Sequence, residues 1–311
     1  MVGASGLCYN RKNVKEEKSM AYGKIIELFL VNGTADSLVT AELFNWNGKA
    51  LKIPRIEIAS CKREDITQAG VYFLFCREDD GQESVYIGEA ENVRDRLIQH
   101  LRDYQADKEK YYWTTAVIFI GSDLNKTLIR YLENRFVEIA RESKRYHLLT
   151  KNTYKNTVIK EAQIAVMEEF INNVKILLNT LGYKVLEPLS RLASEKTYEK
   201  PVEIDEINLH LERTIKNLGK RIQADGVRTS EGFVVLKGSH IAEVDDATIP
   251  VVLKEQRKNA DIVDGILQED MLFSSPSYAA MFVIGKSANG LTSWKDSAGK
   301  TLKEIENNEI K

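Results

Sequence analysis

Three short apolar runs lie between positions 70 and 121, separated by polar segments. Each has the length and the aromatic and β-branched content typical of a buried strand, and they occupy residues 71–75, 85–87 and 115–120. Asp79-Asp80-Gly81 is a hairpin turn signal between the first two, and Gly88 is expected to end the second. From Val93 to Leu101, apolar residues recur at helical spacing. The pattern predicts a three-stranded antiparallel sheet flanked by helices.

Two longer helices are predicted after the third strand. The first spans residues 126–144, and Asp123 or Asn125 is placed to cap it. Its apolar face consists of Leu128, Leu132, Phe136 and Ile139. The second spans residues 161–181, with Gly182 as its C-cap. We expect both helices to pack on the core.

The segment before this core predicts a small β meander. Its strands are expected at residues 25–31, 38–44 and 50–54. The dipeptides Asn32-Gly33 and Asn47-Gly48 are the turn signals between them. We expect the meander to cover an edge of the sheet, and contact with a substrate is the alternative.

The pattern changes after residue 187. Residues 188–201 are polar and broken, as in a linker, and residues 204–218 predict a short helix. A strand is expected at residues 231–239 and a helix at residues 251–267. The chain is therefore divided into a leader at 1–19, a β unit at 20–68, a core domain at 69–186, a linker at 187–228 and a small α+β domain at 229–311.

Composition describes an ordinary globular protein. The chain has 311 residues, enough for about two domains, and is 43% hydrophobic with a net charge of −2. Residues 91–160 hold 14 Lys and Arg against 9 Asp and Glu, a local net charge of +5. This local positive charge is compatible with a phosphate-binding face but does not require one.

The cysteines and the N-terminus indicate the compartment. Cys8, Cys61 and Cys76 form neither a disulfide framework nor a zinc motif, which favours reduced thiols. Residues 1–19 lack the apolar core of a signal peptide. No apolar stretch approaches the roughly 20 residues of a membrane span. We expect a cytoplasmic protein with no membrane partner.

Four polar residues stand out around the second predicted strand. The first two strands each present a tyrosine, Tyr72 and Tyr86, and the following helix presents Arg96 and His100. Guanidinium binds phosphate in a bidentate manner, so this set favours binding and cleavage of a phosphodiester. The structural alternative is that the tyrosines are core-edge aromatics and that Arg96 and His100 form a surface pair.

Gly70-Val71-Tyr72 and Tyr86-Ile87-Gly88 are followed by Asn92, Arg96 and His100 in the spacing N-x-x-x-R-x-x-x-H. This arrangement resembles the signature of the GIY-YIG nuclease superfamily, with Val71 in place of isoleucine. The resemblance implies a GIY-YIG core in which Tyr72 is the general base. It also implies that Tyr86, Arg96 and His100 contact the phosphate. Tyrosine has a pKa of about 10, so nearby cations would have to favour the phenolate.

The same resemblance implies a metal ligand. A glutamate on the helix after the third strand has this role in the superfamily, and Glu133 occupies that place. Taken alone, Glu133 would be interpreted as a surface carboxylate. One carboxylate and a phosphate can hold Mg²⁺ or Mn²⁺, because such hard cations keep several waters. A downstream asparagine orients the site in these nucleases, and Asn152 is preferred over Asn156 for this role.

Residues 231–305 resemble a small C-terminal domain of unknown function that is often found beside GIY-YIG nuclease domains. The features that carry this resemblance are GFVVLKGS, FSSPSYAA and SANGLTSWKDSAGKTL. Ser275 and Pro276 are typical of a helix start. Trp294 and Lys295 suit stacking on a base and contact with a phosphate, although a core position for Trp294 is favoured.

The expected function is a metal-dependent endonuclease that hydrolyses DNA. A nuclease acting on RNA and a non-catalytic nucleic-acid-binding protein with the same fold are the alternatives. A single site cuts one strand per encounter, so double-strand cleavage would require a homodimer or a second binding event.

Overall fold

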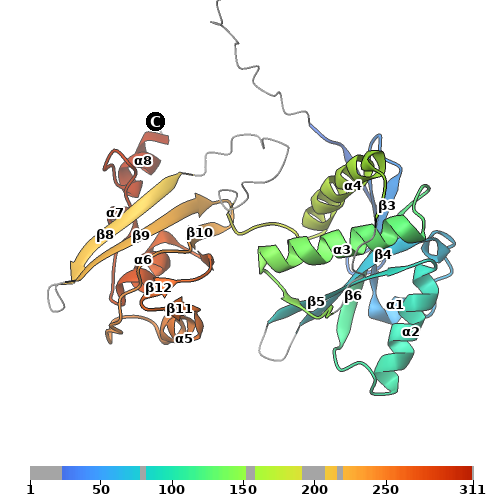
Figure 1. Cartoon of the computed structure of the whole chain (residues 1–311), viewed down its shortest axis with the longest axis horizontal. Coiled ribbons are helices and arrows are strands. Elements are labelled where there is room, and N and C mark those ends of the chain that lie inside the picture. Colours follow the sequence, from blue (N-terminus) through green and yellow to red (C-terminus); the bar gives the residue numbers. More distant parts are fainter. Residues whose placement is uncertain (1–22, 78–81, 152–157, 191–206, 216–219, 310–311) are drawn as a thin grey trace, which may run out of the picture.

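The computed structural model describes residues 23–77, 82–151, 158–190, 207–215 and 220–309. The chain is an α+β protein, which confirms the expected fold class. A seven-stranded sheet lies in the N-terminal part, and sheets of four and two strands lie in the C-terminal part (Figure 1).

The three predicted strands form one side of the seven-stranded sheet. They are β4 (Gly70–Arg77), β5 (Glu83–Ala90) and β6 (Trp113–Gly121). β4 lies between the other two and is antiparallel to both. It is buried on both faces, which explains its continuous apolar run. The expectation that Gly88 ends the second strand is wrong, because Gly88 pairs with Tyr72 inside the β4–β5 ladder. The turn expected at residues 79–81 lies outside the described residues.

The N-terminal meander continues the same sheet. It consists of β1 (Ile26–Leu30), β2 (Val39–Leu43) and β3 (Gly48–Pro54). The strand order is β1-β2-β3-β6-β4-β5-β7, and β3 pairs with β6 along its whole length. The meander therefore covers the β6 edge, as expected. The short strand β7 (His147–Leu148) runs parallel to β5 at the other edge.

Helices cover both faces of this sheet (Figure 1). α3 (Lys126–Ser143) and α4 (Glu161–Thr180) bury their apolar residues against Phe73 and Phe119 on one face. α1 (Arg55–Ile58), the 3₁₀ turn Asp65–Thr67 and α2 (Val93–Gln105) cover the other face. Asn125 caps α3 by accepting hydrogen bonds from the backbone of Thr127 and Leu128, which decides between the two predicted caps.

The C-terminal part has its own sheet and core. The sheet contains β8 (Asn208–Ile215), β9 (Lys220–Thr229), β10 (Gly232–Val235) and β13 (Met271–Phe273), in the order β13-β10-β9-β8. The helices are α5 (Val251–Asn259), α6 (Pro276–Ile284), α7 (Gly290–Ser293) and α8 (Leu302–Glu309). Trp294 is fully buried against Phe233, with ring centroids 4.6 Å apart. The core position favoured for Trp294 is therefore confirmed, and its indole is not free to stack on a base.

Two expectations for this part are wrong. Where a short helix is predicted at 204–218, the described residues 208–215 form a strand instead, because Leu209 and Leu211 alternate with exposed residues. β8 and β9 thus lie inside the expected linker, and the sheet of the C-terminal part begins before residue 229. The helix predicted at 251–267 ends at Asn259, and a hairpin of β11 (Ile262–Val263) and β12 (Ile266–Leu267) follows it. Asp264-Gly265, with both φ angles positive, forms its turn.

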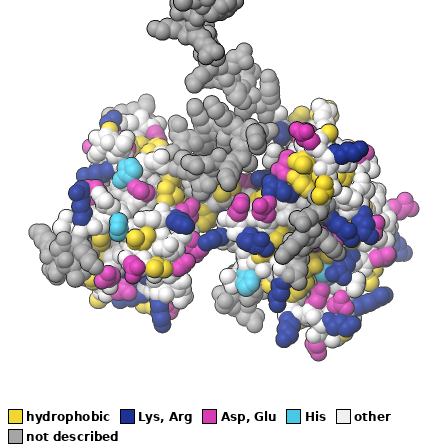
Figure 2. All heavy atoms as spheres, viewed as in Figure 1, with side chains coloured by type: hydrophobic (Ala, Val, Ile, Leu, Met, Phe, Trp, Pro, Cys, Tyr) yellow, Lys and Arg dark blue, Asp and Glu magenta, His cyan; other side chains and the backbone are white. Residues whose placement is uncertain are grey.

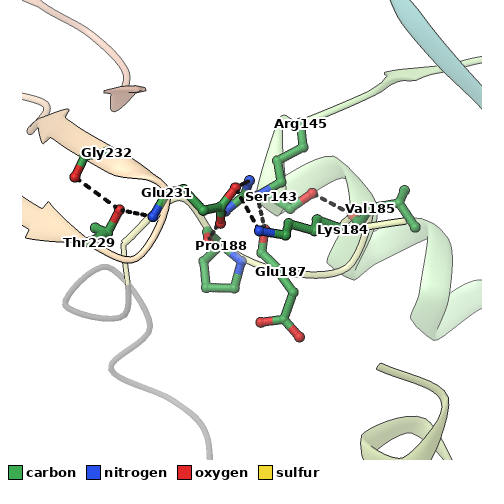
Figure 3. A network of polar contacts seen from close by, with 9 residues as sticks. All are labelled: Ser143, Arg145, Lys184, Val185, Glu187, Pro188, Thr229, Glu231 and Gly232. Atoms are coloured by element: carbon green, nitrogen blue, oxygen red, sulfur yellow. Dashed lines mark hydrogen bonds and ion pairs between the residues drawn. The ribbon is translucent and has the colours of Figure 1, made fainter. Parts of the chain in front are cut away.

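Charged side chains join the two parts, as Figure 3 shows. Arg145, just after α3, donates hydrogen bonds of 2.7 and 2.8 Å to the Glu231 carboxylate in the β9–β10 turn. It also donates to the carbonyl oxygens of Glu187 and Pro188. Lys184 approaches the same carboxylate at 3.2 Å. Figure 2 shows basic and acidic side chains interspersed on the visible face of the molecule.

Within the described residues, no helix combines the length and the apolar character needed to cross a membrane.

Candidate active site

The two motif tyrosines lie on the sheet face covered by α2. Tyr72 on β4 is fully buried, and Tyr86 on β5 is partly exposed. Their rings are stacked with centroids 6.2 Å apart. Tyr72 pairs with Gly88 across the β4–β5 ladder, and Tyr86, two residues before Gly88, projects to the same face of the sheet, so this register brings the rings together.

Gly88 makes the position of Tyr72 possible. A Cβ atom at residue 88 would lie 2.5 Å from Tyr72 Oη and 2.6 Å from its Cζ. No side chain fits at such distances without a shift of the tyrosine. Gly88 is therefore required for the close approach of the ring to the β5 backbone.

Helix α2 brings Arg96 and His100 to this tyrosine. Asn92 begins the helix by accepting a hydrogen bond from the Asp95 backbone. One turn apart, Arg96 Nε donates to Tyr72 Oη at 3.3 Å, and His100 Nε2 lies 2.9 Å from the same oxygen. His100 has no exposed surface, so the alternative of a surface pair is wrong for this histidine.

Two residues of the loop between α2 and β6 complete the cluster. Glu109 Oε1 lies 2.5 Å from His100 Nδ1. Tyr111 stacks on Tyr86 with centroids 5.8 Å apart. The sequence analysis missed both residues. Glu109 stands in a run of mixed charges that resembles any solvated loop, and only the fold shows its partner.

Glu133 comes from α3, on the opposite side of the sheet beside β5. Only 6% of it is exposed, and its buried Oε2 accepts no hydrogen bond. Burial, together with the nearby Glu89 carboxylate, raises its pKa to about 7, against the opposing influence of Arg130 and Arg96. One oxygen of this carboxylate is therefore buried without a hydrogen bond beside a second carboxylate, an environment that a cation would stabilise.

The surroundings of Glu133 fit a hard divalent cation. Its charge acts on Tyr72 and Tyr86, so it belongs to the same electrostatic site. The described residues contain no group of three or more His, Cys, Asp or Glu side chains that could hold a metal. The buried Glu133 carboxylate is an oxygen donor of the kind that Mg²⁺ or Mn²⁺ could take while it keeps several waters.

The electrostatics of Tyr72 differ from the expectation. Burial, and then Tyr86, raise the pKa of Tyr72 well above its usual 10, and the Arg96 guanidinium only partly opposes this. The Arg96 guanidinium alone therefore does not lower the pKa of Tyr72 enough to favour the phenolate.

Asn152 and Asn156 lie outside the described residues, so the predicted orienting asparagine cannot be placed. The chain just before them is held against β5. The Thr150 hydroxyl makes hydrogen bonds of 2.8 Å to both the backbone nitrogen and the backbone oxygen of Ile87.

Residues 214–306 match a family model described as a domain of unknown function, DUF4357. This match supports the C-terminal half of the resemblance seen in the sequence, and it begins upstream of residue 231. The N-terminal part matches no nuclease family model. No curated protein and no solved structure matches the chain.

Proposed function

We propose that the N-terminal part of this chain is a metal-dependent endonuclease that hydrolyses phosphodiester bonds in DNA. The observation that carries the proposal is the convergence of Tyr72, Arg96 and His100 in one hydrogen-bonded cluster, with Tyr86 stacked beside them. Four separate segments supply this cluster and the carboxylate of Glu133, which acts on it.

The resemblance to GIY-YIG nucleases implies a role for each side chain, and the chemistry of each side chain suits that role. Tyr72 takes the proton of the attacking water, and Tyr86 and Arg96 bind the phosphate oxygens. His100 supports Tyr72 from the core. Glu133 would hold the divalent cation, which supplies positive charge against the phosphate when bound.

A non-catalytic nucleic-acid-binding protein is the weaker candidate for a physical reason. A buried carboxylate near the place of a phosphate repels it, and the pKa of Glu133 near 7 reports an environment that already disfavours its charge. Binding alone would be improved by a neutral residue here. Glu133 would hold a cation whose positive charge would remove this repulsion, and this argument favours catalysis.

The test is nicking of supercoiled plasmid by the full chain with Mg²⁺ or Mn²⁺, with a single-stranded RNA of mixed sequence assayed in parallel. Glu133→Ala and Tyr72→Phe should each lower cleavage at least about 100-fold. Glu138→Gln is the matched control on the same helix, since Glu138 is exposed and pairs with Arg135. It should cleave like the wild type.

The alternatives give different results. Cleavage of RNA alone would reassign the substrate. Salt-sensitive binding without cleavage of either polymer would contradict the nuclease and support a binding protein. Cleavage that survives both EDTA and Glu133→Ala would contradict the metal site.

A further inference from the structure

A chain of hydrogen bonds runs from the buried face of β4 to the loop before β6. Tyr72 Oη lies 2.9 Å from His100 Nε2, and His100 Nδ1 lies 2.5 Å from Glu109 Oε1. The side chain of His100 is completely buried and that of Glu109 is 14% exposed. Two successive hydrogen bonds thus join the three groups, and little of their surface is in contact with bulk water.

The chemistry of the two ends determines where the protons lie. An ionised carboxylate can only accept a hydrogen bond, so Nδ1 of His100 carries the proton that Glu109 receives. The other nitrogen of a neutral imidazole is then an acceptor, and the Tyr72 hydroxyl donates to it. Arg96 donates to the same phenol oxygen at 3.3 Å. The oxygen of Tyr72 is therefore bound from two sides.

We propose that Glu109 is a positioning residue that makes His100 the proton acceptor for Tyr72. The inference rests on the nuclease function proposed above. It assigns a role to a carboxylate outside the signature that led to the site. It also assigns a chemical role to the buried His100. A carboxylate that accepts a hydrogen bond from Nδ1 fixes the tautomer, and Nε2 can then act as a base.

The proton transfer is balanced as follows. As the oxygen of a water molecule bonds to phosphorus, the water gives a proton to Tyr72 Oη, and Tyr72 gives its own proton to His100 Nε2. The bond from phosphorus to the leaving oxygen breaks, and that oxygen keeps the electron pair and takes a proton from solvent. Glu109 stabilises the imidazolium until the product leaves; His100 Nε2 then returns its proton to Tyr72 Oη, and Tyr72 passes a proton to a water molecule of the solvent.

This relay removes the difficulty that burial creates for Tyr72. Burial raises the pKa of this phenol well above 10, so a free phenolate would be rare at neutral pH. When His100 takes one proton as the water supplies another, Tyr72 never carries a full negative charge. Tyr111 ties the loop to the site as well, since its ring stacks on Tyr86 and its hydroxyl interacts with Glu109.

The kinetic test compares Glu109→Gln with the wild type in plasmid nicking. Glutamine keeps the shape and an oxygen that accepts from Nδ1, but it lacks the charge. We expect kcat to fall about 100-fold while KM changes less than about threefold. Asp103→Asn, which removes a carboxylate on α2 that pairs with Lys108, should cleave like the wild type.

The pH profile gives a readout that a structural role would not move. Loss of the counter-charge disfavours the imidazolium, so the acid limb of the kcat profile should shift to lower pH in Glu109→Gln. The other titratable or charged groups around this histidine remain the same in both proteins. They are Tyr72 on β4, Tyr86 on β5, Arg96 on α2 and Tyr111 on the loop.

A second measurement reads the histidine without substrate or metal. Nitrogen-15 NMR of the imidazoles distinguishes the tautomers of the four histidines, and His100→Gln assigns the signal. The inference expects the Nδ1–H tautomer in the wild type above neutral pH, and a shifted Nε2 signal in Tyr72→Phe. Because this measurement does not need the Glu109→Gln variant, it tests the tautomer of His100 even if that variant fails to fold.

The outcomes separate the two proposals. Wild-type kcat in Glu109→Gln, or an Nε2–H tautomer of His100, overturns the relay and leaves the nuclease in place. A wild-type protein that cuts neither DNA nor RNA overturns the nuclease function itself and the relay with it. A slow Glu109→Gln enzyme with the expected tautomer and pH shift supports both.

Discussion

Replacement of Glu133 by glutamine should stabilise the metal-free protein at neutral and alkaline pH. The raised pKa means that the folded protein binds a proton at Glu133 more tightly than the unfolded chain does. This contribution to stability is fully present below the ordinary pKa of 4.5 and is lost as the pH rises to about 7. Glutamine mimics the protonated acid at every pH, so the stability of the variant should not decrease as the pH rises to about 7.

The magnitude follows from the shift in pKa. Between 4.5 and about 7 lie roughly 2.5 pKa units, and each unit corresponds to about 1.4 kcal/mol. Because Glu133 is only 6% exposed, solvent screening removes little of this. Above about pH 8 the variant should therefore be more stable than the wild type by up to about 3 kcal/mol, and near pH 4.5 the two should be equal.

The assay is urea unfolding of EDTA-treated protein at about pH 5 and about pH 8. Tryptophan fluorescence reports on the N-terminal part through Trp46 and Trp113 and on the C-terminal part through Trp294. Glu138→Gln should change stability by less than about 0.5 kcal/mol at either pH, because this side chain is exposed. Addition of Mg²⁺ should stabilise the wild type and leave Glu133→Gln unchanged. A glutamine variant that is less stable than the wild type at about pH 8, or a difference independent of pH, would refute the reasoning.

Three further predictions concern the fold around the site. Gly88→Ala should lower the free energy of unfolding by about 1–3 kcal/mol in thermal unfolding and abolish nicking, because the added Cβ displaces Tyr72. Gly121→Ala is the control: its Cβ would meet its nearest neighbour at 3.4 Å, and the loss should be less than about 1 kcal/mol. Arg257→Ala should destabilise the C-terminal part by about 3–5 kcal/mol in calorimetry, because this buried guanidinium binds three backbone carbonyls and an aspartate. Arg145→Ala should loosen the joint between the two parts, which small-angle scattering would detect as a larger radius of gyration; an unchanged radius would show that other contacts hold the parts together.

Local pattern was sufficient to predict most of the N-terminal fold. β4 is buried on both faces and therefore has a continuous apolar run, whereas α3 is buried on one face and therefore has apolar residues at helical spacing. Both patterns can be recognised in the sequence. The failures occurred where the period was short or ambiguous. β8 has only two buried leucines among polar residues, and the hairpin turn at Asp264-Gly265 was absorbed into a helix that looked long enough to include it.

The candidate site was predictable where it coincides with a motif. Tyr72, Arg96 and His100 stand at fixed spacings, and strand pairing and helix geometry bring them together. Glu109 carries no such signal. A loop carboxylate acquires its role from a partner nine positions earlier on a helix, and neither periodicity nor composition distinguishes that carboxylate from its charged neighbours.

Burial disfavours the charged form of both acidic groups of the site, Tyr72 and Glu133, but the two groups need different partners. It weakens Tyr72 as an independent base, since its phenolate would stand in the core. In the proposed relay, His100 takes the proton of Tyr72, so that the phenol never carries a full charge. Burial also makes the Glu133 carboxylate costly, and a bound cation would compensate this charge. The two proposals therefore assign Tyr72 a partner inside the protein that moves a proton, and Glu133 a partner that supplies positive charge.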